Sequence, residues 1–260
     1  MPDHLTDSAF LKDQYHNGSN LSARAGLHER FSTATREFPR RVFEYFDFST
    51  NARVLEIGCG TGLLWTKNRE RIPAAWRLTL SDFSRGMVET ARAAGIAADF
   101  LQSDAQHIPF PSANFEAVIA NHMLYHVADL PRALAEIRRL LKPGGKLYAA
   151  TNGVDHMREL DGLLAECGIK PQAWVLGFSL DNGAECLAKE FVDVQRVDFE
   201  DSLAVTEVEP LVAYVKSGKT RQLISAEGET RLCEIISERI ARDGAFRITK
   251  SPGLFIARAS

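Results

Sequence analysis

Three glycines at alternate positions, Gly58, Gly60 and Gly62, directly follow the apolar run of residues 54–57. A short apolar run of this kind predicts a buried parallel strand, and the apolar residues after Gly62 predict a helix. Glycines at a strand-to-helix turn accept positive φ angles and let a ligand approach the backbone without meeting a Cβ atom. The spacing G-x-G-x-G is one residue shorter than the dinucleotide fingerprint G-x-G-x-x-G. Taken alone, the loop is compatible both with binding a nucleotide-like ligand and with an ordinary tight turn.

Acidic residues close the first three predicted strands: Glu56, Asp82 and Asp104. The carboxyl ends of parallel strands share one edge of a sheet, where ligands bind. A carboxylate at the second strand can accept both hydroxyls of a ribose, and one at the third can accept from an exocyclic amine. Phe83 offers a flat apolar face to a purine ring. One acid at a strand end is usually a helix cap or a solvated loop residue. Three after this loop favour a nucleoside-containing ligand.

The predicted strands and helices must position the glycine loop and the acidic residues. Strand and helix patterns alternate along most of the chain. This alternation predicts a parallel sheet with helices on both faces. Two helices are expected ahead of the first strand, within residues 21–46. The predicted strands are 53–57, 77–81, 98–102, 115–120, 146–151 and 192–199, with a strand pair or one interrupted strand over 246–258. The other predicted helices are 62–71, 84–95, 130–141, 154–168, 182–191, 208–216 and 227–242.

The chain reads as one core domain with additions. Residues 1–50 are predicted to form an N-terminal helical lid segment, and residues 51–260 the core, with cap insertions around 152–180 and 217–243. The segment 15–31, with Tyr15 and His16 at its start, is expected to fold over the ligand. The alternative is a helix that packs on the sheet away from the strand ends.

Four motifs, in this order along the chain, resemble those of a known enzyme family: VLEIGCGTG, LSDFS, SDAQHIPFPSANFEAVIANHMLYHV and ALAEIRRLLKPGGKLY. The chain resembles the class I S-adenosylmethionine-dependent methyltransferases, in the broad type 11 small-molecule group. The resemblance is close over residues 53–151 and looser over 182–217. It implies a Rossmann-like, seven-stranded, mostly parallel sheet of order 3-2-1-4-5-7-6, with strand seven antiparallel. It also implies methyl transfer from S-adenosyl-L-methionine to a small-molecule acceptor by in-line displacement.

The same resemblance implies a set of cofactor-binding residues. The glycine loop would meet the methionine part, Asp82 would bind the ribose, and Phe83 would stack near the adenine. The full set is Glu56, Gly58, Gly60, Gly62, Asp82, Phe83, Asp104, Ala105 and Asn121, with Asp104 and Ala105 at the adenine amino group and Asn121 and His122 near the sulfonium.

Methyl transfer chiefly requires alignment of acceptor, methyl and sulfur, and a general base matters only when the acceptor must lose a proton. His122 and Tyr125 are the candidate catalytic residues. Further histidines that could serve as a base are His16, His126 and His156; for His126, packing is the preferred interpretation. The stretch 121–124 lacks the N-P-P-Y or D-P-P-Y signature of resembling enzymes that act on base amines or glutamine amides, which argues against those nucleic-acid and protein substrates.

Composition and charge exclude several classes of partner. The formal net charge is −3, and no basic stripe interleaved with aromatic residues suggests nucleic acid. No apolar run approaches a membrane span, and the opening residues show no signal-peptide pattern. The four cysteines are far apart in sequence, which predicts reduced thiols, no metal site and a cytoplasmic protein. We expect a monomer or a homodimer.

Two other functions share parts of this pattern. A nicotinamide-dependent oxidoreductase would share the sheet, the glycine turn and an acid near Asp82. The glycine spacing, the extra Asp104 and the absence of a Y-x-x-x-K pair argue against it. A non-catalytic module that binds the cofactor, or serves as a partner subunit, would keep the whole cofactor motif. A turnover assay with many acceptors distinguishes this second alternative.

Overall fold

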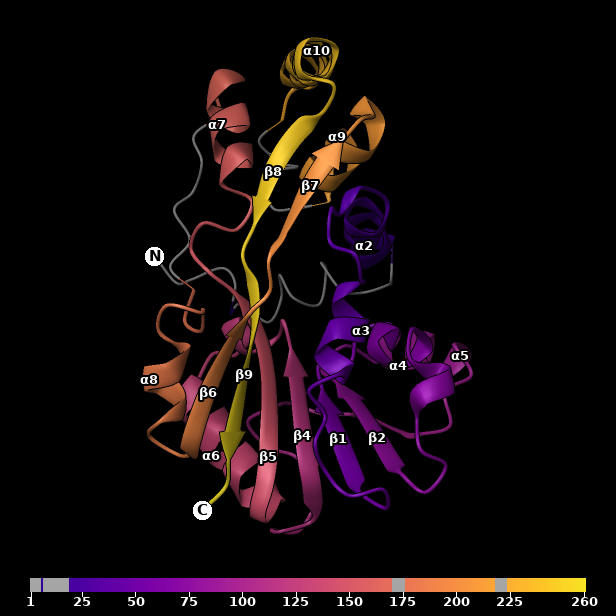
Figure 1. The fold of residues 1–260 in the computed structure, drawn as a ribbon, viewed down its shortest axis with the longest axis vertical. Helices are drawn as coiled ribbons and strands as arrows, with labels where there is room; N and C mark the ends of the chain where they lie inside the picture. The colour runs from indigo at the N-terminus through magenta and orange to yellow at the C-terminus, as the bar shows by residue number, and fades with distance from the viewer. Residues whose placement is uncertain (1–5, 7–18, 170–175, 218–223) are drawn as a thin grey trace.

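The described residues form a seven-stranded sheet of order β3-β2-β1-β4-β5-β9-β6. This is a computed structural model that describes residues 6, 19–169, 176–217 and 224–260. The strands are β1 (Arg53–Ile57), β2 (Arg77–Asp82), β3 (Asp99–Gln102), β4 (Phe115–Asn121), β5 (Leu141–Asn152), β6 (Val192–Asp198) and β9 (Pro252–Arg258). Strand β9 runs antiparallel to both β5 and β6, and the remaining pairs are parallel (Figure 1). The predicted order 3-2-1-4-5-7-6 is confirmed, with β9 as the antiparallel last strand of the chain between β5 and β6.

Both faces of the central strands β1, β4 and β5 are buried, as their continuous apolar runs require. Along β1, Val54 packs in the core on one face and Leu55 in the core on the other. Helices α6 (Leu130–Leu140) and α8 (Gly183–Leu187) cover the face of Leu55. Helices α3 (Phe38–Phe43), α4 (Leu63–Thr66) and α5 (Arg85–Ala93) lie on the side of Val54. Two short 3-10 turns, η1 (Arg69–Arg71) and η2 (Leu124–His126), follow α4 and β4.

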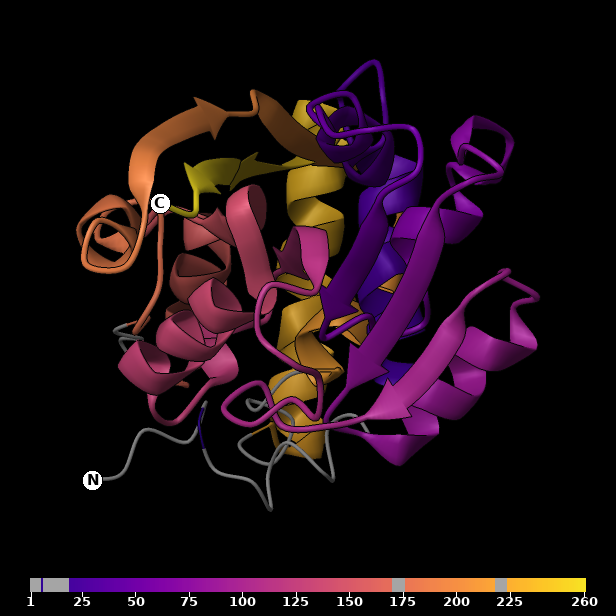
Figure 2. The ribbon, with the colours of Figure 1, turned by 90° about the horizontal axis from the view of Figure 1, so that it is seen from below.

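A second layer, here called the cap, sits above the carboxyl ends of the parallel strands (Figure 1). It consists of helices α2 (Ser19–Phe31), α7 (Arg158–Glu166), α9 (Val208–Lys216) and α10 (Ala226–Asp243) and the antiparallel strands β7 (Asp201–Val205) and β8 (Phe246–Lys250). These elements share a separate apolar core that includes Leu27, Leu163, Leu211, Ile236 and Ile248. The view from below in Figure 2 shows the cap helices behind the sheet, across its width.

The strands β6 and β9 of the main sheet lead directly into the two strands of the cap. Only residues 199–200 separate β6 from β7, and only Ser251 separates β8 from β9. The register continues across the break, since Asp198 faces Gly253 and Asp201 faces Lys250. The predicted strand over 246–258 is therefore two strands in two different sheets.

The N-terminal segment divides between the two layers. Leu27 and Phe31 of α2 are buried in the cap core, whereas Val42 and Phe43 of α3 are buried against the main sheet. The cap also contains β7, α9 and β8, outside the expected insertions at 152–180 and 217–243. Tyr15 and His16 of the expected lid lie outside the described residues.

Several predicted helices are shorter in the structure, and two of them show what sets a helix boundary. Instead of a helix over 154–168, α7 begins at Arg158 because Met157 has a positive φ of 64°. Instead of one helix over 62–71, α4 ends at Thr66 and the η1 turn follows. In both cases the connection to the neighbouring element, rather than the apolar pattern, sets the helix boundary.

Candidate functional site

The glycine loop adopts a left-handed backbone at each of its three glycines, with φ of 68° at Gly58, 53° at Gly60 and 76° at Gly62. A Cβ atom at Gly58 would lie 2.7 Å from Met123 Cβ, and one at Gly62 would lie 2.6 Å from Ile96 Cδ1. Backbone conformation and packing therefore already require glycine at these two positions, whether or not a ligand binds.

Asp82 joins the end of β2 to this loop. Its carboxylate accepts a hydrogen bond from the backbone N–H of Gly60 at 2.9 Å and another from the N–H of Ser84 at 2.8 Å. Burial raises the pKa of Asp82 above its usual value, while these backbone bonds act in the opposite direction. Next to it, the Phe83 side chain is 37% exposed, which leaves an aromatic surface at the same edge. The structure thus brings together the loop and the predicted ribose-binding acid.

The end of β3 lies beside Asp82. The backbone N–H of Ser103 donates to the carbonyl of Asp82 at 3.0 Å. The Asp104 carboxylate that follows accepts from the backbone N–H and the side-chain amide of Gln106, both at 2.9 Å, and Ala105 is buried. The predicted adenine-side residues therefore stand next to the predicted ribose-side residue.

Glu56 is more deeply buried than Asp82 and Asp104, with only 3% of its surface exposed. Its Oε2 atom accepts a hydrogen bond from Trp65 Nε1 at 2.6 Å, and the Asn121 side chain is a second partner. Burial raises the pKa of Glu56 to about 8. Glu56 therefore links β1 to α4 and β4, and its contact with a cofactor stays a prediction.

Buried polar atoms without a hydrogen-bond partner gather at the carboxyl edge of the sheet. Within the described residues, five such side-chain atoms occur: His28 Nδ1, Ser103 Oγ, Asn114 Nδ2, Asn121 Oδ1 and Asn152 Oδ1. Ser103, Asn121 and Asn152 end or follow β3, β4 and β5 at this edge, and His28 lies on cap helix α2. Such groups are rare in folded proteins and call for an explanation. A polar ligand along this edge would supply the missing partners.

His122 follows β4 at the same edge in a strained conformation, with φ of 51°. Its backbone N–H donates to the carbonyl of Ala150 at 2.8 Å, and its ring centroid lies 4.9 Å from that of Phe38. Burial lowers the pKa of His122 to about 4. The imidazole is therefore neutral near pH 7 and able to accept a proton. A non-glycine residue at positive φ is a feature of functional sites.

The remaining candidate bases occupy different places. Tyr125 and His126 lie in η2 with their rings in T-shaped contact, 4.5 Å between centroids, and Tyr125 packs on the core that holds α6. His156 precedes α7, and its Nδ1 accepts from the backbone N–H of Ser251 at 3.1 Å. His28 on α2 was missed by the sequence analysis. Its centroid lies 6.2 Å from that of His156. Only its place beside the apolar Leu27 in a predicted helix could have indicated that it faces inward.

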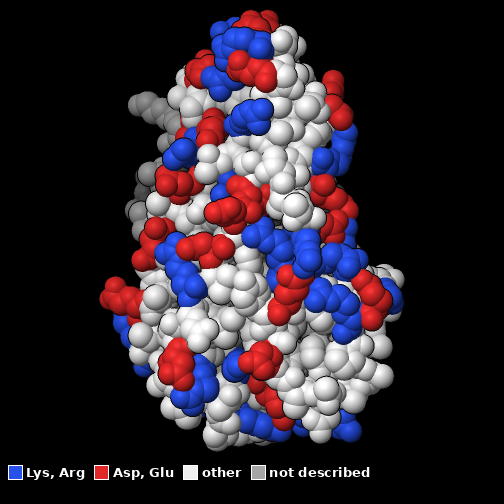
Figure 3. Space-filling model, viewed as in Figure 1, with Lys and Arg blue, Asp and Glu red and all other residues white. Residues whose placement is uncertain are grey.

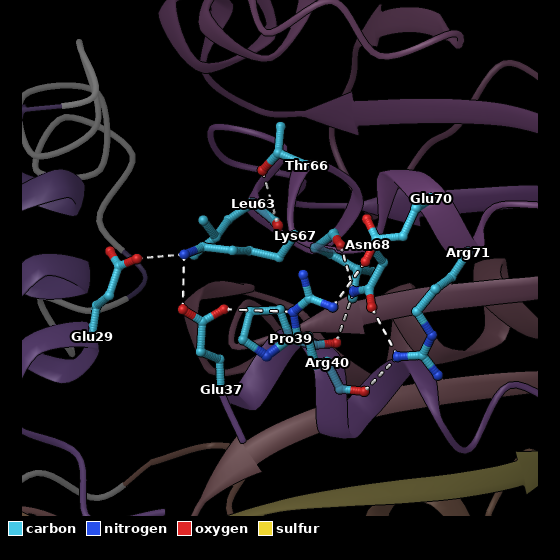
Figure 4. A network of polar contacts seen from close by, with 11 residues as sticks. Glu29, Glu37, Pro39, Arg40, Leu63, Thr66, Lys67, Asn68, Glu70 and Arg71 are labelled. Atoms are coloured by element: carbon cyan, nitrogen blue, oxygen red, sulfur yellow. Dashed lines mark hydrogen bonds and ion pairs between the residues drawn. The ribbon is translucent and has the colours of Figure 1, made fainter. Parts of the chain in front are cut away.

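Ion pairs attach the cap to the helix that follows the glycine loop (Figure 4). Lys67, just after α4, bonds Glu29 of α2 and also Glu37 ahead of α3, the latter at 2.9 Å. The Asn68 side-chain amide donates to the carbonyls of Leu64 at 2.8 Å and Pro39 at 3.1 Å. The loop, the N-terminal helices and the cap therefore meet at one place.

The outer surface carries charges of both signs and a hollow on the cap. Lys, Arg, Asp and Glu are intermingled on the face in Figure 3. A hollow of about 500 Å³ lies between α10, α7 and β8 of the cap, where Arg239 pairs with Glu166 and Arg242 with Asp243. In the part of the chain that the structure describes, no helix has the length and apolar character needed to cross a bilayer.

The comparison with known families agrees with this geometry. Residues 55–149, which hold the glycine loop, Asp82, Asp104 and His122, match the family model for a methyltransferase domain. Over these residues the chain is similar to that methyltransferase family.

Two curated proteins illustrate the range of methyltransferases to which this chain is similar. A malonyl-[acyl-carrier protein] O-methyltransferase of Serratia marcescens is 30% identical over 142 residues, or 55% of this chain and 54% of the relative. A demethylmenaquinone methyltransferase of Renibacterium salmoninarum is 34% identical over 116 residues, or 45% of this chain and 48% of the relative. The chain thus matches about half the length of these relatives.

Among solved structures, the [4+2]-cyclase SpnF is similar over nearly the whole methyltransferase fold, cap included. It has a TM-score of 0.61 and 19% identity, and the match covers 99% of this chain and 97% of that one. At this identity the similarity shows the fold alone.

Proposed function

We propose that this protein is an S-adenosyl-L-methionine-dependent methyltransferase that moves a methyl group to a small-molecule acceptor. One observation carries the proposal. The Asp82 carboxylate accepts a hydrogen bond from the Gly60 N–H, and the Asp82 backbone carbonyl accepts one from the Ser103 N–H just after β3, within the segment that matches the methyltransferase domain. These are the groups that a ribose and an adenine require.

The residues present fit this cofactor. Asp82 would hold the ribose hydroxyls, Phe83 would cover the adenine, and Asp104 with the backbone of Ala105 would face its amino group. The unpartnered Oδ1 of Asn121 would accept a hydrogen bond from the methionine ammonium. The sulfonium supplies a methyl group on a carbon that is already activated. The protein therefore has to align the acceptor and exclude water.

The cap and His122 provide the remaining elements of the mechanism. The cap covers the carboxyl edge, so an acceptor bound beneath it would be shielded from solvent. His122 is neutral at physiological pH because burial lowers its pKa to about 4. It would accept a proton from a hydroxyl, amine or carbon acid as the methyl group arrives. Tyr125 is the second candidate, by its position in η2 just after His122.

The alternative is a protein that binds the cofactor and does not transfer its methyl group. The similarity to a [4+2]-cyclase favours keeping this alternative, because this fold carries chemistry other than methyl transfer. A nicotinamide-dependent oxidoreductase is less well supported, since the matched family and the short glycine spacing both point elsewhere.

Calorimetry and a turnover screen distinguish these functions. We expect binding of S-adenosylmethionine and S-adenosylhomocysteine and no binding of NAD. A screen of small-molecule acceptors, read as S-adenosylhomocysteine release, should find turnover. Binding without turnover across acids, phenols and amines would favour the non-catalytic alternative, and binding of NAD alone would overturn the proposal. We further propose a cytoplasmic protein, consistent with four free thiols, and a monomer or homodimer.

A further inference from the structure

Trp65, Glu56 and Asn121 form a chain of hydrogen bonds, here called the Trp–Glu–Asn chain, which joins α4, β1 and β4. Trp65 Nε1 donates to Glu56 Oε2 at 2.6 Å, and the Asn121 side chain is hydrogen-bonded to the same carboxyl group. Trp65 is 0% exposed and Glu56 is 3% exposed. Because solvent does not reach these two side chains, their polar groups depend on one another for partners.

The strand register independently places Asn121 beside Glu56. In the parallel pair of β1 and β4, Glu56 lies opposite Ile119. Side chains alternate along a strand, so Asn121 lies on the same face as Ile119 and one pleat nearer the carboxyl edge. Ile119 and Trp65 belong to the same apolar core cluster. The Asn121 amide therefore lies between the buried Glu56 carboxyl group and the edge where we propose that the cofactor binds.

The two ends of the Asn121 amide differ chemically, because Nδ2 only donates hydrogen bonds and Oδ1 only accepts them. An ionised carboxyl group has only acceptor oxygens, so Asn121 turns Nδ2 toward Glu56. Asn121 Oδ1 is then left as a buried acceptor without a partner among the described residues. A donor group of a bound molecule would satisfy this oxygen.

The hydrogen bonds of Glu56 lie within the protein. Trp65 occupies Oε2, and Asn121 is the second side-chain partner of the carboxyl group. An effect of Glu56 on a ligand is therefore transmitted by the orientation of Asn121 rather than by direct contact. Trp65 contributes by holding the carboxyl group in place.

We propose that Trp65 and Glu56 are positioning residues that turn Asn121 Oδ1 toward the α-amino group of the cofactor. This inference rests on the proposed function, which supplies the ligand. The protonated amino group has only N–H donors, so it pairs with an amide oxygen and not with an amide nitrogen. A bound ammonium also favours the ionised form of the carboxyl group. The Trp–Glu–Asn chain thereby makes binding selective for the amino group.

The test is calorimetry on the full chain with two ligands, S-adenosylhomocysteine and an analogue with hydrogen in place of its α-amino group. The measurements are made at pH 8.5, above the pKa of Glu56 of about 8, so that the carboxyl group is ionised. The ratio of the two affinities is here called the amino-group preference. We expect the wild type to bind S-adenosylhomocysteine at least about ten-fold more tightly than the analogue.

The Trp65→Phe variant keeps an aromatic ring in the core and removes the N–H donor, so the amino-group preference should fall by at least about three-fold. Asn121→Leu removes the amide, and its preference should be about one. Trp76→Phe is the matched control and should keep the wild-type preference. Trp76 packs on the same core cluster, but its Nε1 donates to the carbonyl of Ser49 at 3.0 Å.

The Glu56→Gln variant tests the same chain where Trp65→Phe fails to fold. The glutamine oxygen accepts from Trp65, so its amide nitrogen meets Asn121, whose amide has to turn to accept a hydrogen bond from it. Asn121 Nδ2 would then face the ligand. The amino-group preference should fall to about one or below, while affinity for the analogue stays within about two-fold of the wild type.

The outcomes separate this inference from the proposed function. Equal losses of affinity for both ligands in Trp65→Phe, or a wild-type preference in Glu56→Gln, would overturn the positioning role alone. A preference lost in Glu56→Gln but kept in Asn121→Leu would show that Glu56 contacts the amino group directly, which also overturns it. A wild-type protein that binds neither ligand would overturn the proposed function itself.

Discussion

Glu56 Oε2 accepts a hydrogen bond from Trp65 Nε1 at 2.6 Å, and both side chains are buried. This hydrogen bond joins the end of strand β1 to helix α4, on the other side of the glycine loop. Because burial raises the pKa of Glu56 to about 8 from an ordinary value of 4.5, the folded protein retains a proton that the unfolded chain loses. The same buried carboxyl group therefore holds the glycine loop in place and makes the stability of the protein depend on pH.

Glu56→Gln should make the protein more stable at alkaline pH. Between about pH 4.5 and about pH 8 the folded state binds more protons than the unfolded state, so wild-type stability falls as pH rises through this window. Glutamine keeps an acceptor for Trp65 and removes this dependence. We expect equal stability near pH 5 and a gain of up to a few kcal/mol near pH 8, at about 1.4 kcal/mol per pKa unit.

Urea denaturation at these two pH values measures the effect. Glu185→Gln, an exposed glutamate on α8, is the matched control and should show no pH-dependent difference. A Glu56→Gln variant that is destabilised equally at both pH values would show that the carboxylate is charged in the folded protein.

Asp82→Ala should weaken S-adenosylhomocysteine binding by about 1.5–3 kcal/mol, the range for hydrogen bonds to a charged group. The structure adds a second reason, since Asp82 also holds the Gly60 N–H at 2.9 Å. Asp82→Asn, which keeps one acceptor oxygen, should show a smaller loss in calorimetry. Asp99→Asn is the control, because Asp99 begins β3 and lies at the amino end of the strands, away from Asp82. Unchanged affinity in the Ala variant would exclude Asp82 from the site.

Two substitutions, Gly60→Asn and Gly60→Val, test whether the glycine loop contacts the ligand. Of the two, Gly60→Asn adds a side chain to the loop without straining the backbone. Valine would be strained at the φ of 53° found here, whereas asparagine tolerates this region. Both variants should lose most of their affinity for S-adenosylhomocysteine, and only Gly60→Val should also lose about 1–3 kcal/mol of stability. Normal affinity in the folded Asn variant would make the loop an ordinary turn.

His122→Ala and His122→Gly should both lose turnover while retaining S-adenosylhomocysteine affinity within about two-fold. The Gly variant should be the more stable of the two by about 1 kcal/mol, because glycine accepts a φ of 51° without a Cβ clash. In the wild type, the rate should fall only below about pH 4–5, as the imidazole becomes protonated. Full turnover in either variant would assign the proton transfer to another group.

Lys67→Met should loosen the attachment of α2 to the core with little loss of global stability. Lys67 bonds Glu29 and Glu37, but these carboxylates are partly exposed, so solvent screening limits the expected cost to less than about 1 kcal/mol. Hydrogen exchange in α2 should become faster. Lys142→Met breaks a comparable pair with Glu116 far from the cap and should leave α2 unchanged. Equal exchange of α2 in both variants would show that the cap is held by its apolar core alone.

The sequence by itself determined the main sheet and the clustering of the glycine loop and the acidic residues at its carboxyl edge. The apolar runs, the glycines at 58, 60 and 62, and the acids at strand ends are local signals, because a strand of period two and a turn requiring positive φ depend on neighbouring residues. Parallel topology then brings the carboxyl ends of these strands to one edge, so the sequence already places Asp82 and Asp104 close together.

Only the tertiary structure decided the cap and the proximity of His28 to His156. Helix α2 and strands β7 and β8 come from distant parts of the chain, and their common core around Leu27 and Ile248 has no sequence period that would reveal it. His28 was missed for the same reason: a histidine in a helix shows neither its burial nor its neighbours. The pKa values of His122 and Glu56 likewise depend on desolvation, which long-range packing sets and local sequence does not.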